Sequence, residues 1–255
     1  MLGLLLAGGC SLPPSTLLVV DAPPPPIETN EPALHAEADP PSTAQKEEET
    51  ERPPLLDAWD MIASEDGAAC RAELKEAGFK FQSMPDRKER DKSGCGIPHG
   101  VIVIKGPTGI VYAPPITVDC TFARALGGVE KIVQEEADTH LKSKIVRITN
   151  VGGFACRPRN FRKGASLSAH AVGSALDLSI FHPKTGEPAI IDRDYDEPPR
   201  STAKQDDRRR FLRAVYQRLR RREADLTYIV GPDFNAVHHN HFHLDRGGWA
   251  FWFNR

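Results

Sequence analysis

The stretch SLSAHAVGSALDLSIF, residues 166–181, places one histidine and one aspartate beside an apolar segment. Its second half, ALDLSIF at 175–181, is a mainly apolar run after small turn residues, a pattern that predicts a buried strand. His170 lies in the turn and Asp177 lies inside the strand. A carboxylate in apolar surroundings is costly unless it is paired or binds a metal. The segment therefore predicts a sheet that carries a partner for Asp177.

The segments on both sides of this strand predict an α+β domain. Apolar or alternating runs bounded by turn residues predict further strands at 101–105, 109–113, 145–149, 189–194, 227–230 and 241–245. Apolar residues at helical spacing predict helices at 67–79, 120–141 and 207–224. Strands in hairpins with helices between them are typical of the α+β class. We therefore expect a small antiparallel sheet with flanking helices.

The overall composition limits the kinds of partner. Of the 255 residues, 40% are hydrophobic and 27% are charged, and the formal net charge is -2. This balance offers no global attraction for a nucleic acid, so no nucleic acid partner is expected. After the first residues, no stretch is long and apolar enough to span a bilayer. The sequence does not indicate an oligomeric state.

The N-terminus has the pattern of an export signal at residues 1–10. MLGLLLAGG is a short apolar run, and Cys10 follows it. LLAGGC resembles a bacterial lipobox, in which the signal is cut before the cysteine and lipid is attached to its sulfur. No basic residue precedes the run, which a misassigned start would explain, and Ala7 stands where Leu or Val is usual. A plain cleaved signal is the alternative. We expect lipidation at Cys10 and a periplasmic location in the bacterial envelope, with the membrane as a partner through the lipid anchor.

Residues 11–54 predict a Pro-rich disordered linker. PPPP at 23–26 and two further PP pairs stand among Ser, Thr, Glu and Ala, and QKEEETER at 45–52 adds a charged block. Such a segment buries too little apolar surface to offset the entropy of ordering. It would let the domain expected at 55–255 reach away from a membrane.

The four cysteines after Cys10 predict two disulfides in an exported chain. They are Cys70, Cys95, Cys120 and Cys156. Three pairings are open, and Cys70–Cys95 with Cys120–Cys156 is favoured because each bridge closes a modest local loop. A bridge of that loop size stabilises by about 3 kcal/mol through the unfolded state. A four-cysteine zinc site is disfavoured because no CxxC pair is present.

The stretch HHNHFHLD, residues 238–245, adds further metal-binding side chains. Side chains of a strand alternate between its faces, so His241 and His243 point one way while Phe242 and Leu244 point the other. Two histidines and one aspartate, with a fourth position open, suit a catalytic zinc ion. The partner predicted for the carboxylate of the first stretch is therefore zinc.

These motifs resemble known families. SAHAVGSALDL at 168–178 matches the Ser-x-His-x-x-Gly-x-Ala-x-Asp signature of the zinc D-alanyl-D-alanine peptidases, which have the hedgehog/DD-peptidase fold. HFH at 241–243 matches their His-x-His motif. GGFACRPRN at 152–160, VGPDFNAVHHNHFHLD at 230–245 and the four cysteines resemble more closely the extensin-like C-terminal domain of bacterial envelope proteins. The resemblance covers most of 65–248.

The resemblance implies roles for individual residues. The implied zinc ligands are His170, Asp177 and His243. His241 would either support a zinc ligand without binding the metal or carry a proton, and His238 would help to polarise the scissile carbonyl. Arg157 would bind a substrate carboxylate or oxyanion, which suits its planar fork. Ser168 is interpreted as the cap of the turn that bears His170 and is included among the candidate substrate contacts.

One position departs from the peptidase pattern. The peptidases carry an acidic general base three residues before the last zinc histidine, and here that residue is Asn240. An amide cannot take a proton from water. His241 or His238 would then serve as the base, or Asp245 would reach in, or the domain would not be a hydrolase.

Two functions from different classes follow. The first is an envelope-anchored zinc metallopeptidase that acts on peptidoglycan stem peptides. The alternative is a non-catalytic, zinc-containing module that binds peptidoglycan or serves as a scaffold. The ligand set favours the first, and Asn240 favours the second.

Overall fold

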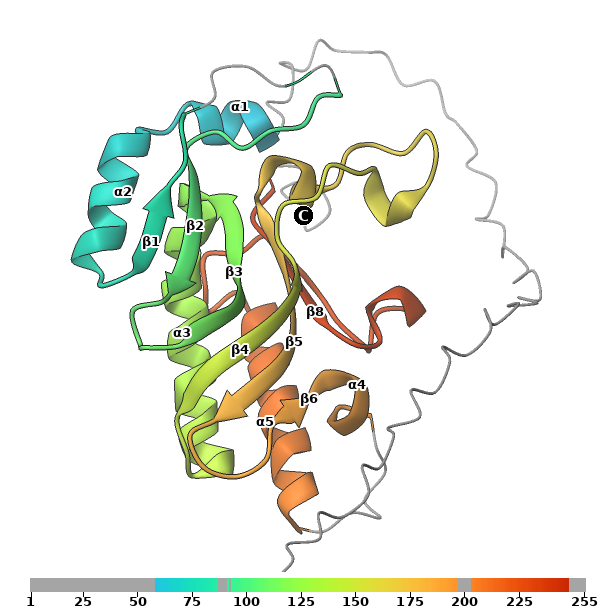
Figure 1. Ribbon diagram of the computed structural model, residues 1–255. Helices are drawn as coiled ribbons and strands as arrows, with labels where there is room; N and C mark the ends of the chain where they lie inside the picture. The colour runs from blue at the N-terminus through green and yellow to red at the C-terminus, as the bar shows by residue number, and fades with distance from the viewer. Residues whose placement is uncertain (1–57, 87–90, 92, 197–202, 248–255) are drawn as a thin grey trace, which may run out of the picture. The chain divides into compact units, whose positions relative to one another are not determined.

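The computed structural model describes residues 58–86, 91, 93–196 and 203–247 (Figure 1). The expected export signal, Cys10 and the expected linker at 11–54 lie outside these residues, so those expectations stay predictions. Within the described part of the chain, no helix has both the length and the apolarity that a membrane crossing requires.

The described residues form one mixed sheet with helices. The strands are β1 Lys80–Ser83, β2 Gly100–Lys105, β3 Val111–Asp119, β4 Ile145–Gly152, β5 Ala175–Pro183, β6 Ala189–Ile190, β7 Tyr228–Val230 and β8 Phe242–Asp245. The helices are α1 Ala58–Ala63, α2 Gly67–Glu76, α3 Cys120–Leu141, α4 Ile191–Asp194 and α5 Ala203–Arg220, and the 3-10 turns are η1 Arg159–Phe161, η2 Ala169–Val172 and η3 Ala236–His238.

The sheet order is β1-β2-β3-β4-β5-β8-β7, and β6 pairs with β5. All pairs are antiparallel except β3 with β4, which the long helix α3 connects. The predicted α+β class, with a mainly antiparallel sheet and flanking helices, is confirmed.

Helix α3 has the bounds that its apolar spacing predicts. It begins after Asp119, whose carboxylate caps the helix by accepting the amide of Phe122 at 2.9 Å. Of the two central glycines, Gly128 lies where another chain segment approaches the helix closely. A side chain there would meet Ala224 at 3.3 Å.

Helices α3 and α5 contact each other and pack against the sheet (Figure 1). Phe242 and Leu244 of β8 are fully buried in the core, where the Phe242 ring stacks on Tyr216 of α5 with centroids 5.1 Å apart. Because a strand alternates its side chains, Asp177 and His243 project from the opposite face. The helices thus decide which face of the sheet can carry a site.

The strand predicted at 189–194 is wrong after its first two residues. Only β6 forms there, and the chain then turns into the short helix α4. The buried carboxylate of Asp194 causes this, because it accepts the Ile190 amide at 2.9 Å and closes the turn. Asp194 also pairs with Arg193 and Arg208, at 2.8 and 3.2 Å. Strand β1 and helix α1 were not predicted.

Two disulfides form, as the sequence predicts, but the favoured pairing is wrong. The bridges are Cys70–Cys120 and Cys95–Cys156, which span 50 and 61 residues. The first joins α2 to the first residue of α3, which packs against it. The second joins two segments whose backbones both hydrogen-bond to η2. Packing of distant segments, not proximity along the chain, selects the partners.

Candidate metal centre

The turn η2 presents His170 to the sheet. Its N-cap is Ser168, whose hydroxyl accepts the His170 amide at 3.4 Å, so the predicted cap is observed. The turn ends at Gly173, where φ is 74°, a conformation that glycine adopts without strain. His170 is 1% exposed as a result.

Register places the other two side chains together. Asp177 of β5 pairs directly with His243 of β8 in the antiparallel ladder. Directly opposed residues of such a pair point to the same face and have neighbouring Cβ atoms. The two segments singled out in the sequence therefore meet across one pair of strands.

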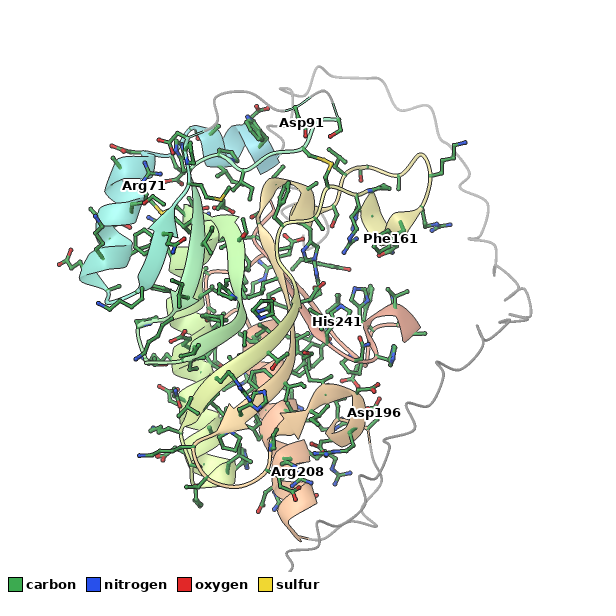
Figure 2. The ribbon with its side chains drawn as sticks, viewed as in Figure 1. Arg71, Asp91, Phe161, Asp196, Arg208 and His241 are labelled. Carbon is green, nitrogen blue, oxygen red and sulfur yellow. A yellow bond between two sulfur atoms is a disulfide. The ribbon has the colours of Figure 1, made fainter. Side chains whose placement is uncertain are left out.

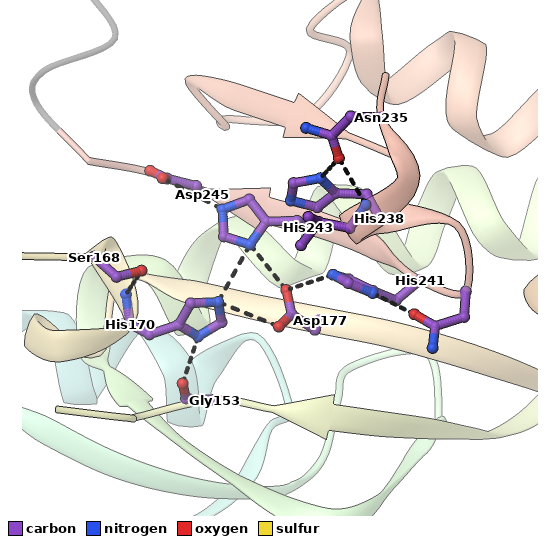
Figure 3. Close-up of polar contacts among 11 residues, drawn as sticks. Gly153, Ser168, His170, Asp177, Asn235, His238, His241, His243 and Asp245 are labelled. Atoms are coloured by element: carbon purple, nitrogen blue, oxygen red, sulfur yellow. Dashed lines mark hydrogen bonds and ion pairs between the residues drawn. The ribbon is translucent and has the colours of Figure 1, made fainter. Parts of the chain in front are cut away.

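The donor atoms of His170, Asp177 and His243 converge on one point (Figure 3). His170 Nε2 lies 3.2 Å from His243 Nδ1 and 3.3 Å from Asp177 Oδ2. His243 Nδ1 lies 2.8 Å from Asp177 Oδ1. Ligands of a tetrahedral zinc ion at about 2.0–2.1 Å are separated by roughly 3.3 Å. The observed spacing is close to that of three corners of such a tetrahedron.

Outer partners orient both imidazoles. The Nδ1–H of His170 donates to the carbonyl oxygen of Gly153 at 2.6 Å, which leaves a lone pair on Nε2. On the far side of His243, Nε2 lies 3.5 Å from Asp245 Oδ2. That oxygen is buried and has no hydrogen-bond partner among the described residues. A neutral His243 with its proton on Nε2 would face Asp245 and turn its Nδ1 lone pair into the site.

The electrostatics of this group favour a cation at its centre. Burial opposes charge on Asp177, but hydrogen bonds from His170 and His243 outweigh it and hold the pKa of Asp177 well below its usual range. Burial also opposes charge on His243, yet Asp177 and Asp245 together raise the pKa of His243 to about 9. Both shifts favour positive charge beside the Asp177 carboxylate, and a metal ion bound by the three donors would supply it.

His238 is held as a hydrogen-bond acceptor toward the cleft. The Asn235 side-chain oxygen accepts the Val237 amide at 3.1 Å, which fixes the orientation of the Asn235 amide group. The same oxygen lies 2.6 Å from His238 Nδ1, which therefore carries a proton and donates it. The lone pair remains on Nε2. Burial, and then the charges of His243 and His241, lower the pKa of His238 to about 4.

His241 lies at the edge of the metal group. Its Nε2 is 3.7 Å from Asp177 Oδ1, and its Nδ1 is 2.7 Å from the side-chain oxygen of Asn240. Burial is the main cause that lowers the pKa of His241. Asn240, which replaces the acidic residue, is exposed and orients this imidazole.

One cleft of about 690 Å³ brings the candidate site residues together. Its lining includes Arg157, Ser168, His170, Asp177, His238, His241 and His243. The Arg157 guanidinium lies over the Phe161 ring, 4.5 Å from its centroid. Every side chain that the sequence singled out for metal, catalysis or substrate thus borders the same space.

The sequence analysis did not identify two groups that orient the histidines of the site, the Gly153 carbonyl and the Asn235 side chain. The Gly153 carbonyl leaves no signal, because any residue has one. Asn235, three residues before His238, could have been recognised as the cap of a turn, since asparagine favours that position.

A family model described as "Extensin-like protein C-terminus" matches residues 68–251. Comparison with curated proteins found no significant match. Comparison with solved structures found none either. The expected relation to the zinc D-alanyl-D-alanine peptidases stays a prediction.

Proposed function

We propose that this chain, which belongs to the extensin-like protein C-terminus family, is a zinc-dependent hydrolase of amide bonds in peptidoglycan stem peptides. The observation that carries the proposal is the convergence of His170 Nε2, Asp177 and His243 Nδ1 at near-tetrahedral spacing on the floor of a cleft. Three protein ligands leave one position of a tetrahedral zinc ion for water or substrate.

The donor set suits zinc on chemical grounds. Imidazole nitrogen with one carboxylate oxygen is a common ligand set of catalytic zinc. Asp245 Oδ2 is buried, lies 3.5 Å from His243 Nε2 and has no hydrogen-bond partner in the described part of the chain, so it completes a carboxylate–histidine arrangement of the kind that supports such ligands. A zinc ion bound there would act as a Lewis acid and lower the pKa of water to near 7.

The proposed base is His238. Its Nε2 carries a lone pair because Nδ1–H is committed to Asn235, so it accepts a proton and does not donate one. His238 was one of the two histidines that the sequence left open as the base, and this assignment replaces the carbonyl-polarising role that the resemblance implies for it. It also removes the need for an acidic residue at position 240.

His241 and Arg157 are proposed to bind the reacting group. In the observed orientation His241 Nδ1–H donates to the Asn240 oxygen at 2.7 Å, but Asn240 is exposed and its amide can turn to offer NH₂ instead. With the amide turned, His241 would carry its proton on Nε2 and direct it toward developing negative charge. The Arg157 guanidinium has one face on Phe161 and borders the cleft, where its planar fork suits a carboxylate or oxyanion.

The alternative is a module that binds peptidoglycan without cutting it. Asn240 favours this alternative, because the residue type that serves as base in the peptidases is absent. The metal group would then have a structural role, and His238 would contact ligand only.

The proposed location is the periplasmic side of the bacterial envelope, with a lipid on Cys10. The two disulfides support an oxidising compartment. A Cys10→Ser chain should leave the membrane fraction and should not incorporate labelled fatty acid.

The deciding experiment incubates the purified full chain, loaded with zinc, with muropeptides and identifies products by mass spectrometry. We expect one zinc per chain and hydrolysis of an amide bond. His238→Ala should keep zinc and lose roughly 100- to 10,000-fold in rate, as is typical for a general base. A zinc-loaded wild type that binds muropeptides and cuts none would replace the hydrolase with the binding module.

A further inference from the structure

Apolar side chains of the protein surface gather at the cleft that holds the metal group. Among the described residues, eight large hydrophobic side chains are exposed. The four most exposed are Phe161 at 76%, Val151 at 62%, Val237 at 59% and Phe234 at 55%, and all four line this cleft. Exposed apolar groups that gather in one place usually mark a binding site.

These four side chains belong to two walls on opposite sides of the metal group. The first, the β4 wall, comprises the end of β4 and the segment after it, and consists of Val151, Arg157, Arg159 and Phe161. The second, the β8 wall, lies in the connection from β7 to β8 and consists of Phe234, Val237, His238 and His241. Figure 2 labels one member of each wall, Phe161 and His241.

Sheet topology places the metal ligands between the walls. Strand β5 has β4 on one side and β8 on the other. Asp177 of β5 pairs with Gly152 at the end of β4 and with His243 of β8. A ligand that contacts Val151 and Phe161 on one side, and Phe234 and Val237 on the other, therefore passes over Asp177.

The two walls differ in charge. Arg157 and Arg159 are the Lys or Arg side chains that line the cleft, and both belong to the β4 wall. The acidic side chains in the lining, Asp177 and Asp245, are buried at the floor. The residues of the β8 wall include no Asp, Glu, Lys or Arg. A ligand with a carboxylate on one flank and small apolar groups on the other complements this arrangement.

From these two walls, and on the premise of the proposed function, we infer that the substrate is an internal amide of a cross-linked peptide. Its carboxylate-bearing segment lies on the β4 wall, and a neutral segment with small apolar side chains lies on the β8 wall. A substrate that ended at the scissile bond would leave most of one wall unused. The cleft is thus specific for a chain that continues on both sides of the metal.

The test compares two probes on the zinc-loaded full chain. One is a cross-linked dimeric muropeptide, and the other is a monomeric muropeptide that ends in a terminal D-alanine. We expect kcat/KM for the dimer to exceed that for the monomer by at least roughly 10-fold, the effect of one lost apolar contact. Val237→Ser on the β8 wall should raise the KM for the dimer by roughly 5- to 10-fold.

The matched control is Val146→Ser. Val146 is also an exposed valine of the same domain, but it does not line this cleft. If the monomer loses its last residue as fast as the dimer is cut, and Val237→Ser behaves like Val146→Ser, the substrate ends at the metal. That result overturns this inference and leaves the hydrolase intact.

A binding measurement separates this inference from the proposed function. The dissociation constant of the dimer is measured by calorimetry with the wild type, Val237→Ser and Val146→Ser. If the dimer binds uncut and Val237→Ser alone weakens it, hydrolysis is refuted and the two-walled cleft is supported. If neither probe is cut or bound, both proposals fail.

Discussion

The two disulfides close loops of similar length but hold very different parts of the molecule. The core bridge, Cys70–Cys120, joins α2 to α3, and both of its cysteines are buried. The site bridge, Cys95–Cys156, joins a buried cysteine to an exposed one that borders the cleft next to Arg157. The bridges close loops of 50 and 61 residues, so each lowers the entropy of the unfolded chain by nearly the same amount. Each therefore stabilises the folded state by about 4 kcal/mol.

The two bridges differ in the chain segments that they connect. The segment after β4 supplies the Gly153 carbonyl to His170, and its Ala155 amide donates to the His170 carbonyl oxygen at 3.1 Å. The site bridge fastens this segment. The core bridge fastens two helices that contribute no side chain to the cleft. The two bridges thus stabilise the fold by similar amounts, but only the site bridge holds a segment that orients a residue of the metal group.

The largest contrast is expected between two buried polar side chains, one in the metal group and one in helix α3, which the core bridge ties to α2. His170→Ala should abolish zinc retention, because three ligands leave none to spare. Glu130→Gln in α3 is the matched control. Glu130 is fully buried and accepts from Thr108 and Tyr112, so the variant should be less stable and still hold one zinc. Zinc per folded chain by plasma mass spectrometry is the measurement, and a zinc-loaded His170→Ala chain would refute the ligand set.

Removing each bridge tests the comparison directly. Cys70→Ala/Cys120→Ala and Cys95→Ala/Cys156→Ala should each lower the free energy of unfolding by roughly 3–4 kcal/mol. The site-bridge variant should also bind zinc about 10-fold more weakly, because the carbonyl that orients His170 is released. Urea unfolding and competition with a zinc chelator measure the two effects. Equal zinc affinity in both variants would show that the site bridge has no special role.

Asp119, next to the core bridge, should make stability depend on pH. Burial raises the pKa of Asp119 from 3.8 to about 6. Between these values the folded chain keeps a proton that the unfolded chain releases, so the free energy of unfolding falls as pH rises. The contribution is fully present below pH 3.8 and lost above about 6, and it amounts to at most about 3 kcal/mol. Asp119→Asn should flatten this slope in urea unfolding at pH 4 to 7. A slope identical to that of the wild type would contradict the assignment.

The smallest change in free energy is expected at Asp245, the second buried aspartate whose Oδ2 has no hydrogen-bond partner among the described residues. Asp245→Asn removes the charge behind His243 and should weaken zinc binding by roughly 10- to 100-fold. Asp119→Asn changes a buried carboxylate whose hydrogen bonds go to Thr121 and the Phe122 amide and not to the ligand side chains, so it should leave zinc affinity unchanged. Competition titrations of the two variants decide, and equal zinc affinities would mean that Asp245 does not support the ligand.

Local patterns predicted much of the fold and the site. The period of two in HFHLD placed His243 on one face and Phe242 in the core, and both placements hold. The helical spacing of 120–141 predicted α3 to its last residue. Both patterns are local, since periodicity needs only neighbouring residues. The strand predicted at 189–194 failed because the buried Asp194 carboxylate, whose partners include the distant Arg208, ends it.

By itself, the sequence determined the α+β class, the four cysteines as two bridges, and the His and Asp side chains of the metal group. Only the tertiary structure decided which cysteines pair, that the Gly153 carbonyl orients His170, and that Asn235 holds His238 with its lone pair toward the cleft. Residue type and spacing specify which atoms are available. Which cysteines pair, which nitrogen of each histidine carries the proton and which side chains face the cleft depend on how segments far apart in the chain pack together. Helix α3 and the β5–β8 ladder create that packing.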